Sequence, residues 1–214
     1  MKTALMALAV ALALALTVVR IGPLVPSTAS AGDSSTAGAP ERAAAAIARL
    51  GGTYAVDETS PGRPIVAVDL HAAAVQDAQL SFLEGLPRLR SLDLRLTKIG
   101  DAALLHLRNA AELETLNLFR TSVGDEGLSR LAGSTRLRTL MLGGTKVTDA
   151  GLVHLHGMAS LEKLSLFETA VTDRGLVHLR NLTRLERLLI TGSKVTDAGA
   201  RDLRESLPRL RFEE

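Results

Sequence analysis

The amino-acid sequence predicts an α/β solenoid, a right-handed β/α horseshoe arc with short parallel strands on its concave face and short helices on its convex face. Three observations support this fold class. The chain resembles itself at intervals of 24 residues, its leucines align in columns when the copies are compared, and aromatic residues make up only 2% of the chain. Such a period is the signature of stacked repeats. A core with so few rings must consist of many similar aliphatic contacts, which stacked turns supply.

The repeated part covers residues 62–214 and contains about six rows. A typical row is STRLRTLMLGGTKVTDAGLVHLHG. One row cannot bury its own leucines, so neighbouring rows must cover one another. The rows begin at Gly62, which starts a degenerate copy, and then at Leu86, Ala110, Ser134, Met158 and Leu182.

Each row combines two periodicities. In the third row Leu116 and Leu118 alternate with polar residues, which is typical of a short strand with one face buried. Leu128 and Leu131 lie three residues apart, as on one face of a helical turn. We therefore expect every row to run strand, turn, short helix and return.

The recurring letters TKVTDAGL are interpreted as scaffold, because a catalytic group is not needed in every row. We expect each aspartate to cap its own helix and each glycine to permit close packing of neighbouring helices. Hydroxyl residues ahead of the motif are expected to be buried and to bond backbone groups of the turn. The aspartates are Asp77, Asp101, Asp125, Asp149, Asp173 and Asp197; the glycines are Gly127, Gly151, Gly175 and Gly199; the hydroxyl residues are Thr97, Thr121, Thr145, Thr169 and Ser193.

These columns resemble the leucine-rich repeat family, whose signature LxxLxLxx(N/C)xL is represented here as LxxLxLxxTxV. The VTDxGL segment resembles the cysteine-containing subfamily, with Thr or Ser in place of Cys. That subfamily is best known from substrate-binding solenoids of F-box proteins, but this chain has no F-box segment. The resemblance implies a bacterial, exported repeat protein that binds other proteins.

The N-terminal residues predict export. Residues 1–31 have a basic start, an apolar run over residues 4–19 and small residues up to Ala31, which is the layout of a cleaved signal peptide. An uncleaved membrane anchor is the alternative, and only then would the chain contact a membrane. The expected location is periplasmic, cell-envelope or secreted. Residues 32–61 are expected to form a linker followed by a capping helix from Pro40 and a strand.

Composition disfavours several functional classes. Lys2 and Arg20 lie in the leader, and without them 23 basic residues balance 23 acidic ones, which gives no case for nucleic acid. The chain has no cysteine, no nucleophile paired with a base and no phosphate loop. His106, His154 and His178 share a column but lie in different rows, too far apart for one metal ion. We expect no enzyme activity, no cofactor, no metal and no small-molecule substrate.

The candidate binding site lies on the concave face. Phe119 and Phe167 occupy one outward column two rows apart, about 10 Å from each other, with Gly143 as a bare notch between them. Exposed rings beside a gap are typical interface anchors. We expect this patch to bind a peptide or protein partner, the alternatives being a structural spacer without a ligand or, less favoured, a substrate adaptor. The predicted binding residues are Asn117, Phe119, Met141, Gly143, Ser165, Phe167 and Leu189.

Overall fold

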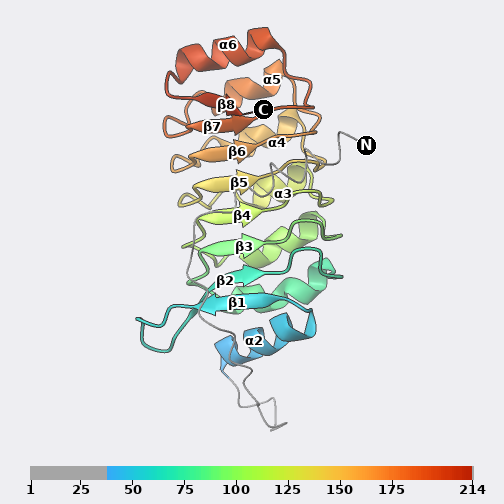
Figure 1. Cartoon of the computed structure of the whole chain (residues 1–214), viewed down its shortest axis with the longest axis vertical. Coiled ribbons are helices and arrows are strands. Elements are labelled where there is room, and N and C mark those ends of the chain that lie inside the picture. Colours follow the sequence, from blue (N-terminus) through green and yellow to red (C-terminus); the bar gives the residue numbers. More distant parts are fainter. Residues whose placement is uncertain (1–37, 214) are drawn as a thin grey trace. The chain divides into compact units, whose positions relative to one another are not determined.

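The computed structural model describes residues 38–213, so the predicted signal peptide or anchor over residues 1–31 lies outside the described residues. The described part is built on one eight-stranded sheet in which the strands follow one another in chain order (Figure 1). Strand β1 runs antiparallel to β2, and all later strands are parallel. The strands are β1 (Thr53–Val56), β2 (Ile65–Asp69), β3 (Ser91–Asp93), β4 (Thr115–Asn117), β5 (Thr139–Met141), β6 (Lys163–Ser165), β7 (Arg187–Leu189) and β8 (Arg211–Glu213).

The strand register follows the 24-residue period. Leu116 pairs with Leu92 on one side and with Leu140 on the other, and the same column continues through Leu164 to Leu188. Each of these inward leucines is at most 2% exposed. The sequence prediction of an α/β solenoid with parallel strands is therefore confirmed.

Helical turns lie on the side of the sheet opposite the concave face (Figure 1). Rows that carry glycine two residues after the aspartate begin with an α-helical turn, whereas the rows with Gln79 or Ala103 at that position form 3-10 helices. The helical segments are α2 (Ala39–Arg49), η1 (Asp77–Gly85), η2 (Asp101–Leu107), α3 (Asp125–Arg130), α4 (Asp149–Leu152), η3 (Val153–Leu155), α5 (Asp173–Leu176), η4 (Val177–Leu179) and α6 (Asp197–Ser206).

The first end of the stack is covered by α2, which packs against β1 and η1. Pro40 lies in the first turn of α2, as expected from its fixed backbone angle. The helix buries Ala43 and Ile47 completely, at 1% and 0% exposure. The helix expected from Pro40 is thus present, and it covers apolar side chains of the first rows.

The repeated aspartates do not cap their own helices, which corrects the sequence-based expectation. Asp125 Oδ1 accepts the backbone N–H of Thr148 in the next row at 2.8 Å, and its Oδ2 accepts the Thr148 hydroxyl at 2.6 Å. Thr148 is the N-cap residue of α4, and its hydroxyl oxygen accepts the N–H of Ala150 at 3.3 Å. A carboxylate can accept two donors at once, so it bridges rows while threonine caps the helix.

The same bridge recurs along most of the stack. Thr172 bonds Asp149 through its amide at 2.7 Å and its hydroxyl at 2.6 Å, and Thr196 bonds Asp173 at 2.8 and 2.7 Å. In the earlier rows glycine replaces the threonine and only the amide bond remains, from Gly100 to Asp77 at 2.8 Å and from Gly124 to Asp101 at 2.6 Å.

The glycine column is explained by this bridge. A Cβ atom on Gly127 would lie 2.6 Å from Oδ1 of Asp101, and a Cβ on Gly151 or Gly175 would contact Asp125 or Asp149 in the same way. The expected close packing of neighbouring helices is therefore present, because Asp101, Asp125 and Asp149 are the first residues of the helical segments in the preceding rows.

The threonines that follow the strands complete the backbone bonding of the turn, as expected. Thr121 is 6% exposed, and its hydroxyl donates to the carbonyl of Leu118 at 2.8 Å. Thr97, Thr145 and Thr169 make the equivalent bond at 2.6, 2.6 and 2.7 Å. Ser193 differs, because its hydroxyl oxygen accepts the N–H of Val195 at 3.4 Å instead.

We predict that Thr148→Val lowers the free energy of unfolding by about 1–2 kcal/mol, because Asp125 loses a donor and Ala150 loses its capping acceptor. Valine has the same shape as threonine, so the core is unchanged. Urea unfolding followed by far-ultraviolet circular dichroism measures the change. Thr135→Val, at an exposed position, is the matched control and should stay within about 0.5 kcal/mol of the wild type.

We also predict a pH dependence from Asp173. The backbone amide of Thr196, and then its hydroxyl, hold the pKa of the Asp173 carboxyl below its ordinary value. Because the pKa is lower in the folded state, this stabilisation is complete above the unfolded-state pKa and disappears as the pH falls through the folded-state pKa. Between pH 6 and pH 3, roughly spanning the ordinary aspartate pKa, the urea midpoint should fall less for Asp173→Asn than for the wild type. Equal falls would contradict the role given to Asp173.

Candidate functional site

The concave face consists of the outward residues of each strand and the first residue of the turn that follows. The turn continues the row-to-row hydrogen bonding beyond the strands. Arg120 N–H donates to the carbonyl of Gly143 at 2.8 Å, and Gly144 N–H donates to the carbonyl of Phe167 at 2.7 Å. The backbone of the predicted patch is therefore held by the rows on both sides.

A sharp bend follows each outward column. Arg120 and Glu168 have φ of 53° and 51°, in the left-handed region that favours glycine, and Gly144 between them has 67°. Side chains in this region cost about 1–2 kcal/mol relative to right-handed backbone. The bonds to neighbouring rows hold these residues in place, so the bend keeps the preceding Phe119 and Phe167 at fixed positions.

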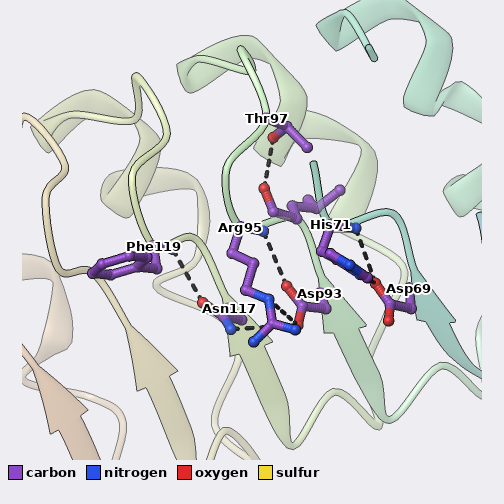
Figure 2. Close-up of polar contacts among 8 residues, drawn as sticks. Asp69, His71, Asp93, Arg95, Thr97, Asn117 and Phe119 are labelled. Atoms are coloured by element: carbon purple, nitrogen blue, oxygen red, sulfur yellow. Dashed lines mark hydrogen bonds and ion pairs between the residues drawn. The ribbon is translucent and has the colours of Figure 1, made fainter. Parts of the chain in front are cut away.

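The first strands carry a polar cluster of Asp69, His71, Asp93, Arg95 and Asn117 (Figure 2). Asp69 Oδ1 accepts the backbone N–H of His71 at 2.9 Å and lies 2.8 Å from the His71 ring nitrogen Nδ1. Asp93 repeats the backbone bond with Arg95 at 3.0 Å, and Arg95 Nε lies 3.3 Å from the second Asp93 oxygen. Most polar groups of this cluster therefore bond one another.

The surroundings of Asp93 shift its titration. Burial raises the pKa of the Asp93 carboxyl above its ordinary value, and the Arg95 backbone N–H and charge only partly oppose this. The neighbouring Asp69 adds to the rise because it is negative too. The two carboxylates side by side give this end of the concave face a negative character.

Asn117 links the polar cluster to the aromatic residues. Its Oδ1 accepts the backbone N–H of Phe119 at 3.1 Å, and its Nδ2 donates to Asp93 Oδ2 at 3.4 Å (Figure 2). Asn117 thus positions the backbone of Phe119. This side chain was predicted as a direct binding residue, and the structure gives it this orienting contact as well.

Phe119 and Phe167 do not flank an open notch, which corrects the sequence-based picture. Their ring centroids lie 6.3 Å apart with an interplanar angle of 34°, rather than about 10 Å apart. The rings lean toward each other along the stack because their contact removes apolar surface from water. This distance is typical of a favourable aromatic pair. Both side chains remain half-buried, so part of the pair is accessible.

Gly143 makes this contact possible. It is buried beneath the rings, and a Cβ at this position would lie 2.9 Å from Phe119 Cδ2 and 3.2 Å from Phe167 Cβ. Gly143 therefore packs beneath the two rings and does not form an open notch between them. A partner can reach the rings but not Gly143.

Arg120 and Glu168 border the pair. The Arg120 guanidinium carbon lies 5.2 Å from the Phe119 ring centroid, and Arg120 Nη2 lies 3.4 Å from Glu168 Oε2. The contact between cation and ring and the long ion pair span the row that contains Gly144. This arrangement limits the freedom of Phe119 before any partner binds.

The remaining predicted residues differ in accessibility. Met141 is half-buried and stays available, whereas Ser165 and Leu189 are only 2% and 4% exposed. Leu189 was expected to border a notch, but it lies between Ser165 and Glu213 of the two flanking strands, which leave it little contact with solvent. The accessible apolar residues of the concave patch are thus Phe119, Met141 and Phe167.

Comparison with solved structures identifies the fold. An internalin (InlF) from Listeria monocytogenes aligns over 84% of this chain and 59% of its own length, with a TM-score of 0.54 and 22% identity. The chain has the leucine-rich repeat fold. It spans less than two thirds of that internalin.

Plant leucine-rich repeat receptors give similar agreement. The ectodomain of the Arabidopsis thaliana receptor kinase GASSHO1/SCHENGEN3, solved with CASPARIAN STRIP INTEGRITY FACTOR 2, matches 75% of this chain and 19% of its own, with a TM-score of 0.54 and 18% identity. The ectodomain of SOBIR1 from the same plant matches 76% of this chain and 95% of its own, with a TM-score of 0.51 and 16% identity. The similarity to these two plant ectodomains is one of fold.

Sequence comparison agrees with the fold over two rows. A leucine-rich repeat family model matches residues 86–107 and 112–132. No curated protein sequence was found to match the chain.

The histidines of the leucine-rich repeat rows form no metal site among residues 38–213, where no group of three metal-ligating side chains comes together. His106 instead contacts Glu84 in the preceding row, with Nδ1 2.8 Å from Oε1. In the same residues no helix is long and apolar enough to cross a membrane.

A separate cavity of about 590 Å³ lies at the C-terminal end of the leucine-rich repeat stack. Its lining includes Ile190, Val195, Ala200 and Phe212. Ala200 stands where earlier rows carry leucine, and this smaller side chain is the sequence signal for a cavity that was not predicted. Its lining joins apolar side chains to Arg201 and Arg204 and does not include the aromatic pair.

We predict that Gly143→Ala lowers the free energy of unfolding by about 1–3 kcal/mol, because the new methyl group must displace the Phe119 ring. Chemical denaturation measures the loss, and the ring-proton shifts of the two phenylalanines should report their separation. Gly157→Ala is the matched control, since the nearest atom to its Cβ would be 3.9 Å away. Equal stability of both variants would contradict the close contact beneath the rings.

Proposed function

We propose that the chain is a non-catalytic interaction module that binds a peptide or protein segment on its concave face. The observation that carries this proposal is the half-exposed pair of Phe119 and Phe167, with Met141 beside it. Paired rings that remain accessible at the centre of a sheet resemble the anchors that dominate binding energies in protein interfaces.

Preorganisation of the patch supports the proposal. The backbone of Phe119 is fixed by Asn117, its ring lies over Gly143, and its outer side contacts Arg120. A side chain that is ordered before binding loses less conformational entropy when a partner arrives. The patch thus offers apolar surface at a small ordering cost.

The leucine-rich repeat fold also supports the proposal. Proteins with this fold generally use their extended curved surface for protein-protein interaction. The GASSHO1/SCHENGEN3 ectodomain was solved in complex with CASPARIAN STRIP INTEGRITY FACTOR 2, which is consistent with a protein or peptide partner for this chain. The inference from that receptor is an analogy of fold.

The location proposed for this interaction is outside the cytoplasm. The support is the signal-like pattern of residues 1–31, with the apolar run over residues 4–19 as an anchor if cleavage does not occur. The VTDxGL pattern further supports membership of the cysteine-containing leucine-rich repeat type in an exported form.

We predict that replacing Phe119 and Phe167 together by serine abolishes capture of the natural partner, because both accessible rings are lost. The measurement is cross-linking of the chain in its own host, followed by identification of the attached protein and comparison of its yield between variants. The far-ultraviolet spectrum should not change, since neither side chain belongs to the inward leucine columns.

The matched control replaces Leu105 and Val177, which are 42% and 46% exposed on helical segments, by serine. This variant should retain capture, because it removes exposed apolar side chains from the other face of the sheet. If the phenylalanine variant captures the same protein in the same yield, the concave patch is not the binding site and a spacer role is favoured.

A further inference from the structure

Several ion pairs in this structure join oppositely charged side chains on different rows. Each such pair joins positions 22 to 24 residues apart, or 48 for one that skips a row. These contacts offset charges that the stacking of the rows brings together. The pairs are Arg88 and Arg90 with Glu112, His106 and Arg108 with Glu84, Arg138 with Glu162, and Arg120 with Glu168.

One column on the concave face carries three positive charges in succession. Lys163, Arg187 and Arg211 are the first residues of β6, β7 and β8, and they lie directly opposite one another in the parallel register. We call these three residues the cationic ladder. The equivalent outward residues of β4 and β5 are Thr115 and Thr139, which are uncharged.

The cationic ladder is unfavourable in the free protein. Adjacent strands lie about 4.7–4.9 Å apart, and like charges directly opposite one another destabilise a sheet. The one ion pair that reaches the ladder joins Arg187 to Glu213, and at 3.6 Å it is the longest ion pair among the described residues. Lys163 and Arg211 make no ion pair within residues 38–213.

The ladder stands beside the aromatic patch. Lys163 begins β6, and Phe167 lies in the turn of the same row, four residues further along the chain. At the strand rise of about 3.3 Å per residue, a segment lying along the concave face could contact both. The opposite end of this face carries Asp69 and Asp93 as neighbouring carboxylates, of which Asp93 pairs with Arg95. The strand residues at β2 and β3 are thus acidic, whereas the first residues of β6, β7 and β8 are all basic.

From this polarity we infer that the partner segment is an extended acidic peptide, with an apolar side chain on the Phe119–Phe167 pair and carboxylates on the cationic ladder. This inference rests on the proposed function and specifies the chemistry of the ligand. A carboxylate placed between two residues of the cationic ladder relieves the repulsion between them. Part of the binding energy therefore comes from removing a repulsion that exists in the free protein. The negative end at β2 and β3 disfavours an acidic segment there and directs it toward β6 to β8.

The test is selection of random peptides, displayed on phage, against the full chain. Peptides are kept when they bind the wild type and fail to bind the Phe119→Ser, Phe167→Ser variant. We expect the kept peptides to share an apolar residue flanked by Asp and Glu, with a net negative charge. Their affinity should fall at least ~10-fold for the variant Lys163→Glu, Arg187→Glu, Arg211→Glu, and should weaken as salt is raised.

The matched control carries the same change of charge outside the strands, as Arg174→Glu, Arg180→Glu, Lys194→Glu. All three positions are exposed, and this variant should bind the peptides like the wild type. Kept peptides that are neutral or basic, or that bind the ladder variant unchanged, overturn the acidic-ligand inference and leave the proposed function standing. Recovery of no peptide that depends on the phenylalanines overturns both.

Discussion

The hydrogen bonds that the aspartates from Asp77 to Asp173 accept from the next row hold the successive rows in register on the helical side of the sheet. A carboxylate such as Asp149 reaches across to both donors of Thr172, while Thr172 caps the helix that begins beside it. The same carboxylate contact therefore accounts for the capping of the helix, the spacing of the rows and the glycine two positions after the aspartate. On the other side the strand ladders impose the same spacing, and the concave face keeps its residues in straight columns because both sides agree.

The fold could be predicted because the equal length of the rows sets the register between neighbouring strands. Equal rows bring Leu92, Leu116 and Leu140 opposite one another whatever the details of the turns. The hydrogen-bond donors of the aspartates could not be predicted in the same way. An amide two residues ahead and an amide in the next row are equally good donors, and only the tilt of the helical turn in space selects the second.

The candidate site was predicted by position but not by shape. Alternation along a strand correctly places Phe119 and Phe167 in one outward column, yet it says nothing about the direction in which a ring leans. Side-chain torsions bring the rings together over Gly143, and this converts an expected gap into a continuous apolar ridge. Leu189 shows the same limit, because its burial depends on the neighbours from β6 and β8 rather than on its own position.

The incomplete burial of the row beside the cavity sets a direction for the loss of structure. Leu166 and Val171 inside the stack are fully buried, whereas Ile190 and Val195, their counterparts one row later, remain partly in contact with water beside the cavity. In a stack of this kind every interior turn has two neighbours and a terminal turn has one, so melting proceeds by fraying inward from the weaker end. Phe167 follows β6, two strands before β8, and Phe119 follows β4, so the ring pair can outlast the peeling of α6 and β8.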